Sequence, residues 1–232
     1  MFGPRIDTGS TLSANPWYEL FTAAGGPLAN LFLAALVYIM KGNPGFTAGF
    51  SFFFEVSLAL AAINLLPAWP LDGGRMLRSA VSIGLGIRMG CRVVVMSGLL
   101  VSVCLAGAGV QCRGAGLLLM MPAGLLMAAA LQEHANYPMN RLVYFSARRR
   151  YLASVRQMPV RFVVADGRTR VIDLLDGIRA GSFHWIRPNR PDGSESPWIS
   201  EIRLIDACLC GNGGRPLDWI IQQETSFEQI IL

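Results

Sequence analysis

Charged residues are scarce in this sequence. Asp, Glu, Lys and Arg make up 15% of the 232 residues, whereas about a quarter is usual for a soluble domain, and 53% of the residues are hydrophobic. The few charges are also unevenly placed, because residues 1–131 hold 7 of the 20 Lys and Arg and 4 of the 15 Asp and Glu. The shortage of charge argues against an ordinary soluble protein, and its uneven distribution places a boundary between two regions of the chain near Gln132.

Histidine and cysteine are few as well. The sequence has two histidines, His134 and His184, and five cysteines. Cys208 and Cys210 are too closely spaced for a zinc ribbon, and an odd number of cysteines fits a reduced protein that faces the cytosol. The opening residues also lack the basic and apolar regions of a signal peptide, so none is predicted.

Long apolar runs predict four membrane spans, since about 20 apolar residues cross a bilayer. The runs cover residues 20–40, 45–66, 93–110 and 115–131, and Glu55 is the one carboxylate inside them. We therefore expect an α-helical polytopic protein of the cell membrane, with its transmembrane core at residues 20–131. The net charge of +5 is then explained by basic cytosolic loops, and no nucleic-acid partner is predicted.

Arginines beside the spans predict the orientation, because Lys and Arg resist translocation. Two regions are rich in arginine, and four spans place both regions on the same side of the membrane. They are Arg75, Arg78, Arg88 and Arg92 before the third span, and Arg141, Arg148, Arg149 and Arg150 after the fourth. The N-terminus and the C-terminus are therefore expected in the cytosol.

The chain after the last span changes to an α/β pattern. Residues 132–158 are basic with interleaved aromatics, which predicts a juxtamembrane connector attracted to anionic lipid. Within residues 159–232 the order is strand 160–164, helix 169–181, strand 182–187, a turn, strand 197–200 and helix 201–209. His184 lies on a predicted strand and is expected to be structural.

The stretch at residues 64–75, NLLPAWPLDGGR, carries the chemistry. Pro67, Pro70 and the pair Gly73–Gly74 cannot continue a regular helix, so the chain must break at membrane depth beside a polar notch. A carboxylate there is costly, which makes Asp72 a functional-site residue with a metal or a cation as its partner. A helix-capping Asp at the membrane surface is the alternative.

A second stretch lies in the first span, where residues 24–30 read AGGPLAN. Gly25 and Gly26 allow close approach of a neighbouring backbone, Pro27 follows them, and Asn30 can bond to another helix.

Together the two stretches resemble the site-2 protease family of intramembrane zinc metalloproteases, which carry A-G-P-x-x-N followed by N-x-x-P-x-x-P-x-D-G. The stage IV sporulation processing protease branch is the most similar. The resemblance implies that Asp72 is a zinc ligand and that Asn64, with Pro67 and Pro70, positions the substrate. It also implies cleavage of a membrane-associated protein precursor, such as a pro-transcription factor, inside or near the membrane.

The sequence departs from that family in two respects. Gly25 and Gly26 precede Pro27 where the family usually has Ala and Gly, and a whole motif is missing. It contains no H-E-x-x-H, the helix motif that supplies two zinc-binding histidines and the general base. Glu133 and His134 are adjacent and are expected to be surface or interfacial residues. We therefore expect residues 1–19 to be the remnant of a loop, the chain to be an N-terminally truncated form, and residues 1–232 alone to bind no stoichiometric zinc.

Two other interpretations stay open. The chain could be a non-catalytic membrane scaffold with a sensory C-terminal domain, or a small transporter, for which Glu55 is the main argument. Residues 160–209 are similar to a single cystathionine-β-synthase (CBS) module, which implies at best weak ATP binding because such modules usually work in pairs. The sequence leaves open whether the chain forms a homo-oligomer.

Overall fold

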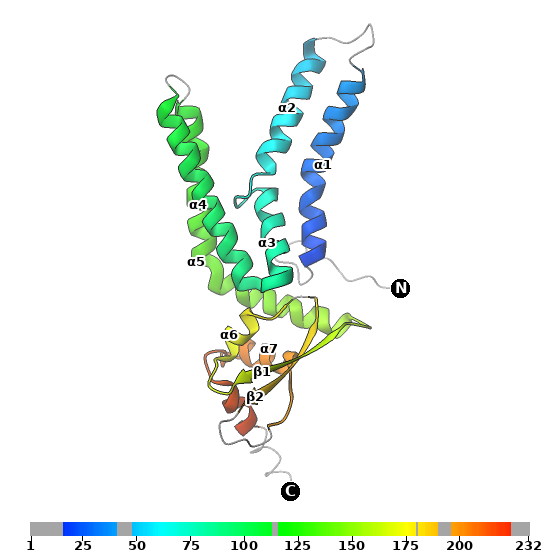
Figure 1. The fold of residues 1–232 in the computed structure, drawn as a ribbon, viewed down its shortest axis with the longest axis vertical. Coiled ribbons are helices and arrows are strands. Elements are labelled where there is room, and N and C mark those ends of the chain that lie inside the picture. The colour runs from blue at the N-terminus through cyan, green and yellow to red at the C-terminus, as the bar shows by residue number, and fades with distance from the viewer. Residues whose placement is uncertain (1–15, 41–47, 113–115, 180, 190–195, 224–232) are drawn as a thin grey trace. The chain divides into compact units, whose positions relative to one another are not determined.

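A computed structural model describes residues 16–40, 48–112, 116–179, 181–189 and 196–223 (Figure 1). It divides into two compact units, each described by itself below. We call residues 16–81 with 89–137 the membrane unit, and residues 82–88 with 138–223 the C-terminal unit.

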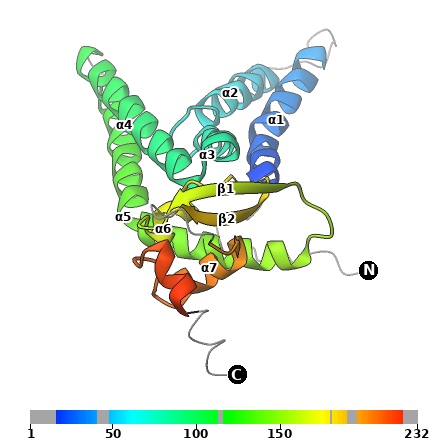
Figure 2. The ribbon, with the colours of Figure 1, turned by 60° about the horizontal axis from the view of Figure 1, so that its bottom comes forward.

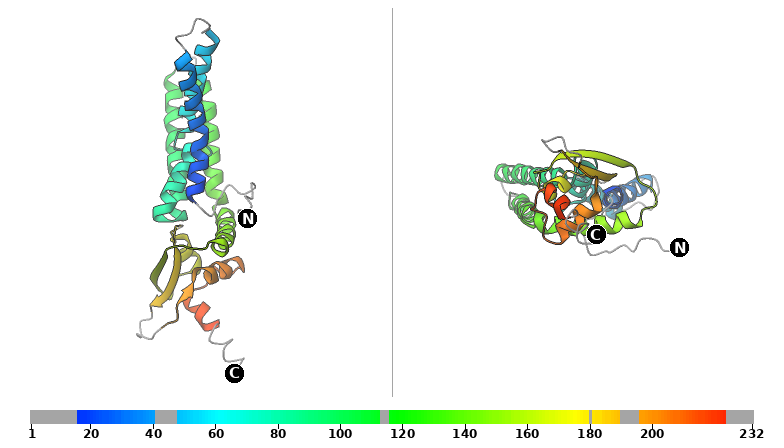
Figure 3. Two further views of the ribbon diagram at one scale, coloured as in Figure 1. Left: turned by 90° about the vertical axis from the view of Figure 1, so that its right-hand side faces the viewer. Right: turned by 90° about the horizontal axis from the view of Figure 1, so that it is seen from below.

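Five helices supply the membrane unit, and three of them, α3, α4 and α5, also have residues in the C-terminal unit. The helices are α1 (Pro16–Met40), α2 (Ala48–Asn64), α3 (Asp72–Leu85), α4 (Ile87–Gln111) and α5 (Gly116–Ser154). Helix α1 packs along α2, and α4 lies beside α5 (Figures 1 and 3). A methyl group at Gly98 of α4 would lie 3.4 Å from the Cβ of Ala130 of α5, so small residues bring these two helices together.

Three of the described helices, α1, α4 and α5, are long and apolar enough to cross a membrane. The second predicted span corresponds to a shorter apolar helix, Phe50–Asn64, because the chain leaves the helix before Pro67. Only 22%, 28% and 22% of the most apolar stretch of α1, α4 and α5 is buried inside the protein. The remaining apolar surface suits contact with lipid acyl chains, as in a multi-pass membrane protein.

A three-stranded sheet forms the C-terminal unit together with its helices (Figure 2). The elements are β1 (Val160–Asp166), α6 (Val171–Asp176), β2 (Phe183–Asn189), β3 (Ile199–Ser200) and α7 (Glu201–Leu209), followed by a helical stretch at 217–223. Strand β1 pairs parallel with β2, with Val160 opposite Phe183, and β2 pairs antiparallel with β3. The predicted order of strands and helices is confirmed.

Burial alternates along β2, because successive side chains of a strand point to opposite faces of the sheet. His184, Ile186 and Pro188 are buried. Ile186 lies in a core to which the helices also contribute, formed by Val171, Leu175, Leu204, Ile205 and Leu217. The basic stretch predicted as a connector is helical as far as Ser154, since α5 continues through it, and Phe145 is buried on that part of the helix.

Candidate functional site

The chain breaks between α2 and α3, as the prolines predict. The backbone bonds within the break are local: Leu66 N–H donates to Ile63 O at 3.0 Å, Ala68 N–H to Leu66 O at 2.8 Å, and Leu71 N–H to Ala68 O at 2.9 Å. The Trp69–Pro70 peptide bond is cis. The break thus supplies many of its own hydrogen-bond partners, as a non-helical segment must where water is excluded.

Gly73 and Gly74 let the first turn of α3 fold against this break. A methyl group at Gly73 would overlap the carbonyl oxygen of Leu65, and one at Gly74 would lie 2.5 Å from the carbonyl carbon of Ala68. Both neighbours are backbone atoms, which cannot turn aside as a side chain can. The double glycine is therefore required by packing, and it fixes where Asp72 begins α3.

The Asp72 carboxylate lies against Gly26 of α1. A methyl group at Gly26 would be 2.6 Å from Asp72 Oδ2, so a larger residue there would require this carboxylate to move. On another side, Arg75 Nη1 lies 3.6 Å from Asp72 Oδ1, and both side chains are partly exposed. The fold thus brings together the two sequence stretches that carry the family resemblance, although 46 positions separate the two residues.

The other predicted site residues surround this point less closely. A methyl group at Gly25 would meet no neighbouring heavy atom within 4 Å, and Pro27 is buried within α1. Asn30 and Asn64 are half-buried, whereas Pro67, Pro70 and Glu55 are at least partly exposed. Within the described part of the chain, neither Asn30 nor Asn64 has a side-chain hydrogen bond to Asp72.

A buried ionic cluster was missed by the sequence reasoning. Arg78 of α3 is 2% exposed and bonds Glu19 of α1, while its Nη1 lies 3.3 Å from Glu133 Oε1 of α5. The guanidinium also lies over the ring of Trp69, 4.7 Å from its centroid. We call these four residues the Arg78 cluster.

Two expectations are corrected by this cluster. Glu133 was expected at the surface or the membrane interface, but it is 6% exposed because it accepts a bond from Arg78; His134 beside it is exposed. Arg78 was counted as a loop arginine, yet it lies inside α3 and is buried.

Zinc coordination needs more ligands than the described residues bring together. A catalytic zinc site uses three protein ligands and an open position for water. No group of three or more His, Cys, Asp or Glu side chains suited to a metal occurs in the described part of the chain. Asp72 has the right chemistry for one ligand, but the described residues do not by themselves fit a complete zinc centre.

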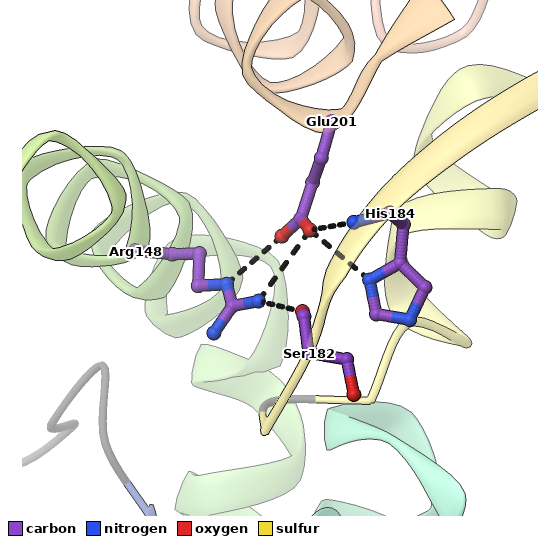
Figure 4. A network of polar contacts seen from close by, with 4 residues as sticks. All are labelled: Arg148, Ser182, His184 and Glu201. Atoms are coloured by element: carbon purple, nitrogen blue, oxygen red, sulfur yellow. Dashed lines mark hydrogen bonds and ion pairs between the residues drawn. The ribbon is translucent and has the colours of Figure 1, made fainter. Parts of the chain in front are cut away.

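The C-terminal unit holds a second polar network, which joins α5, β2 and α7 (Figure 4). Arg148 donates from Nε to Glu201 Oε1 at 2.8 Å and from Nη2 to the carbonyl oxygen of Ser182 at 2.6 Å. The backbone N–H of His184 donates to Glu201 Oε2 at 3.0 Å, and His184 Nδ1 lies 3.1 Å from the same oxygen.

Burial tends to raise the pKa of Glu201, but hydrogen bonds from His184 and Arg148 outweigh it, so the pKa lies below its ordinary value. Nearby on α7, burial raises the pKa of the Cys208 thiol to about 11, which keeps it protonated and inert. Neither group faces a candidate site among the described residues, so this network is best explained as part of the fold.

Comparison with known families shows what the Asp72 region is similar to. Residues 41–105 match the model of peptidase family M50. This M50 region contains α2, the break, α3 and most of α4, and therefore Asp72, Gly73 and Gly74. M50 is the site-2 protease family, whose members depend on zinc. No curated protein matches the chain.

Proposed function

We propose that this chain belongs to an intramembrane metalloprotease of the site-2 type, with Asp72 as a zinc ligand. One observation carries the proposal: in the M50 region, the carboxylate of Asp72 lies at a broken helix against Gly26 of α1. A carboxylate at such a place is costly unless it has a partner, and a metal ion provides one.

The chain's own residues would hold and shape the site. Asp72 offers a carboxylate oxygen, Gly26 leaves the space beside it open, and Arg75 is the nearest cation that the structure shows. Asn64 and the prolines of the break would position the peptide. When bound, zinc would polarise the scissile carbonyl and activate water. The sequence contains no H-E-x-x-H, so a test of this proposal must supply the two histidines and the glutamate of that motif.

A cleavage assay tests this proposal. Residues 1–232 joined to an H-E-x-x-H helix encoded by the upstream DNA should cut a membrane-embedded peptide, and a zinc chelator should stop the cleavage. Asp72→Ala should lower the rate by about four orders of magnitude, as loss of a central catalytic group does. Undiminished cleavage by Asp72→Ala would contradict the role of this carboxylate.

The substrate class belongs to the same proposal. A membrane-associated precursor, such as a pro-transcription factor, fits a protease of the sporulation-processing branch. The order of a membrane core followed by a small C-terminal domain supports that branch. A panel of membrane-anchored precursors with the joined protein tests it. Cleavage confined to soluble peptides would contradict it.

The second candidate function is a non-catalytic membrane scaffold with a sensory C-terminal domain. It is favoured by one observation on the described residues, which bring together no group of three or more side chains suited to a metal. Sequencing the DNA upstream of the Met1 codon discriminates the two. An in-frame H-E-x-x-H favours the protease, whereas an in-frame stop codon with no such motif favours the scaffold.

The orientation of the chain is part of the proposal too. The arginine distribution supports a topology in which an even number of spans leaves both termini in the cytosol. Reporter fusions after Lys41 and after Arg150 should then report opposite sides of the membrane. Reports from the same side would contradict this topology.

We also infer weak ATP binding by the C-terminal unit, supported by the resemblance of the sequence of residues 160–209 to a single CBS module. A single module offers half of the usual paired cleft. Calorimetric titration of the whole chain with ATP should give at best weak binding, and tight one-to-one binding by a monomer would contradict the half-cleft argument.

A further inference from the structure

The Arg78 cluster connects three helices that are far apart in the sequence. Glu19 precedes Arg78 by 59 positions and Glu133 follows it by 55, and the three side chains come from α1, α3 and α5. All three are at most 6% exposed. A buried guanidinium with two carboxylates strongly disfavours any arrangement that separates them, because a lone buried charge is costly.

This connection acts on the helix that carries Asp72. Arg78 lies six residues after Asp72 on α3, less than two turns away, and Glu19 lies seven residues before Gly26 on α1. The Arg78–Glu19 bond therefore ties α3 to α1 within about two turns of the contact between Asp72 and Gly26. Trp69, which lies under the guanidinium, belongs to the break that leads into Asp72.

We propose that Arg78 is a positioning residue for the Asp72 carboxylate. By bonding Glu19 of α1 and Glu133 of α5 together, it sets the rotation and depth of α3 so that Asp72 meets Gly26. A rotation of α3 by one residue, about 100°, would carry Asp72 away from α1. The importance of this geometry rests on the proposed function, but the geometry itself is testable without any catalytic activity.

Disulfide formation between two cysteine pairs tests the geometry in the intact chain in membranes. The first pair, Gly26→Cys with Asp72→Cys, reports the contact between α1 and α3. Its feasibility follows from the 3.7 Å between a methyl carbon at Gly26 and Asp72 Cγ. The control pair, Gly98→Cys with Ala130→Cys, reports α4 against α5, where a Cβ at position 98 would lie 3.4 Å from that of Ala130. Mass spectrometry of peptides separates both products from pairs with the native cysteines.

Arg78→Gln should slow formation of the 26–72 disulfide by about tenfold, because two buried carboxylates lose their shared cation. It should leave the rate of the 98–130 disulfide within about twofold, because additivity holds for distant sites. Arg92→Gln removes an exposed arginine of α4 outside the cluster and should change neither rate. If Arg78→Gln does not insert into the membrane, Glu133→Gln, which leaves the bond to Glu19, should slow the 26–72 pair alone.

Two results would overturn the inference. An unchanged 26–72 rate in Arg78→Gln or Glu133→Gln would show that Asp72 is held without the cluster. Equal slowing of both pairs would show that the cluster stabilises the unit in general and positions nothing. Failure of the proposed function is a separate result. In that case the 26–72 disulfide would still depend on Arg78, whereas a protein with Asp72 intact and an added H-E-x-x-H helix would bind no zinc.

Discussion

Each unit of the molecule buries an arginine among side chains from distant parts of the sequence, yet the two arrangements differ. Arg148 is 1% exposed and bonds one carboxylate, Glu201, and a backbone carbonyl. Arg78 is 2% exposed and bonds two carboxylates, within two turns of Asp72. A buried arginine is therefore not itself a sign of function.

The neighbours of each arginine carry the distinction. The partners of Arg148 also bond one another. The Glu201 carboxylate is paired with Arg148 and with the backbone N–H and the ring of His184. Around Arg78 the helix leads to a partly exposed carboxylate beside a glycine, in a region that matches a zinc peptidase family. The first cluster stabilises a small α/β fold, and we infer that the second also orients a site.

Removal of Glu201 should give the largest effect on folding. Glu201→Ala leaves Arg148 buried without its carboxylate, and breaking a buried pair in this way costs about 3–5 kcal/mol. Hydrogen exchange of the intact chain should show faster exchange in β2 and α7, with α1 to α4 unchanged. Asp206→Ala, which removes the exposed partner of Arg149, is the matched control and should have little effect. Equal, small effects of both variants would remove the structural role of this network.

The two glycines of α1 sharpen the comparison at the site. In residues 1–232 joined to an H-E-x-x-H helix, Gly26→Ala should weaken zinc binding by about tenfold. The added methyl group displaces the Asp72 carboxylate, and a small shift of a metal ligand lowers affinity by about this factor. Gly25→Ala should not, since its methyl group has open space, and its better helix propensity should stabilise α1 by about 0.5–1 kcal/mol. Zinc titration of both variants tests this, and equal affinities would show that the contact at Gly26 is unimportant.

Acid should affect the C-terminal unit through Glu201. The pKa of Glu201 is lower in the folded protein than its ordinary value of 4.5, so the folded state favours the ionised form. Its contribution to stability is therefore complete above pH 4.5 and is lost as the pH falls through the folded pKa, at up to about 1.4 kcal/mol per pH unit. Glu201→Gln should flatten this part of the stability curve, whereas a slope that survives in Glu201→Gln would have to come from other carboxylates.

Local sequence patterns predicted much of the fold. The apolar runs indicated the helices, and the prolines at 67 and 70 indicated the break before Asp72. In the C-terminal unit, the β-branched and apolar residues of 160–164 and the turn residues before Trp198 indicated the strand order that β1, β2 and β3 have. These features are set by neighbours in the sequence, so a single sequence is sufficient to find them.

Features that depend on tertiary contact were not predictable in the same way. An arginine beside an apolar run has the same local signature whether it is a loop residue or a buried one, so Arg78 was read as a loop residue and its partners were missed. The length of α5 was missed because its apolar run ends at Leu131, while the polar turns that follow remain helical to Ser154. The contact between Asp72 and Gly26 joins distant positions, and no sequence pattern predicted it.

Zinc stoichiometry tests the central claim most directly. Residues 1–232 joined to an H-E-x-x-H helix, purified in detergent, should hold one zinc per chain by elemental analysis. Asp72→Ala should lose that zinc while it still inserts into the membrane, and Asp166→Ala, which removes an exposed carboxylate of β1, should retain it. Full zinc occupancy in Asp72→Ala would contradict the account. So would one zinc per chain in residues 1–232 alone that is lost on His134→Ala, because the metal would then lie on α5 and not at Asp72.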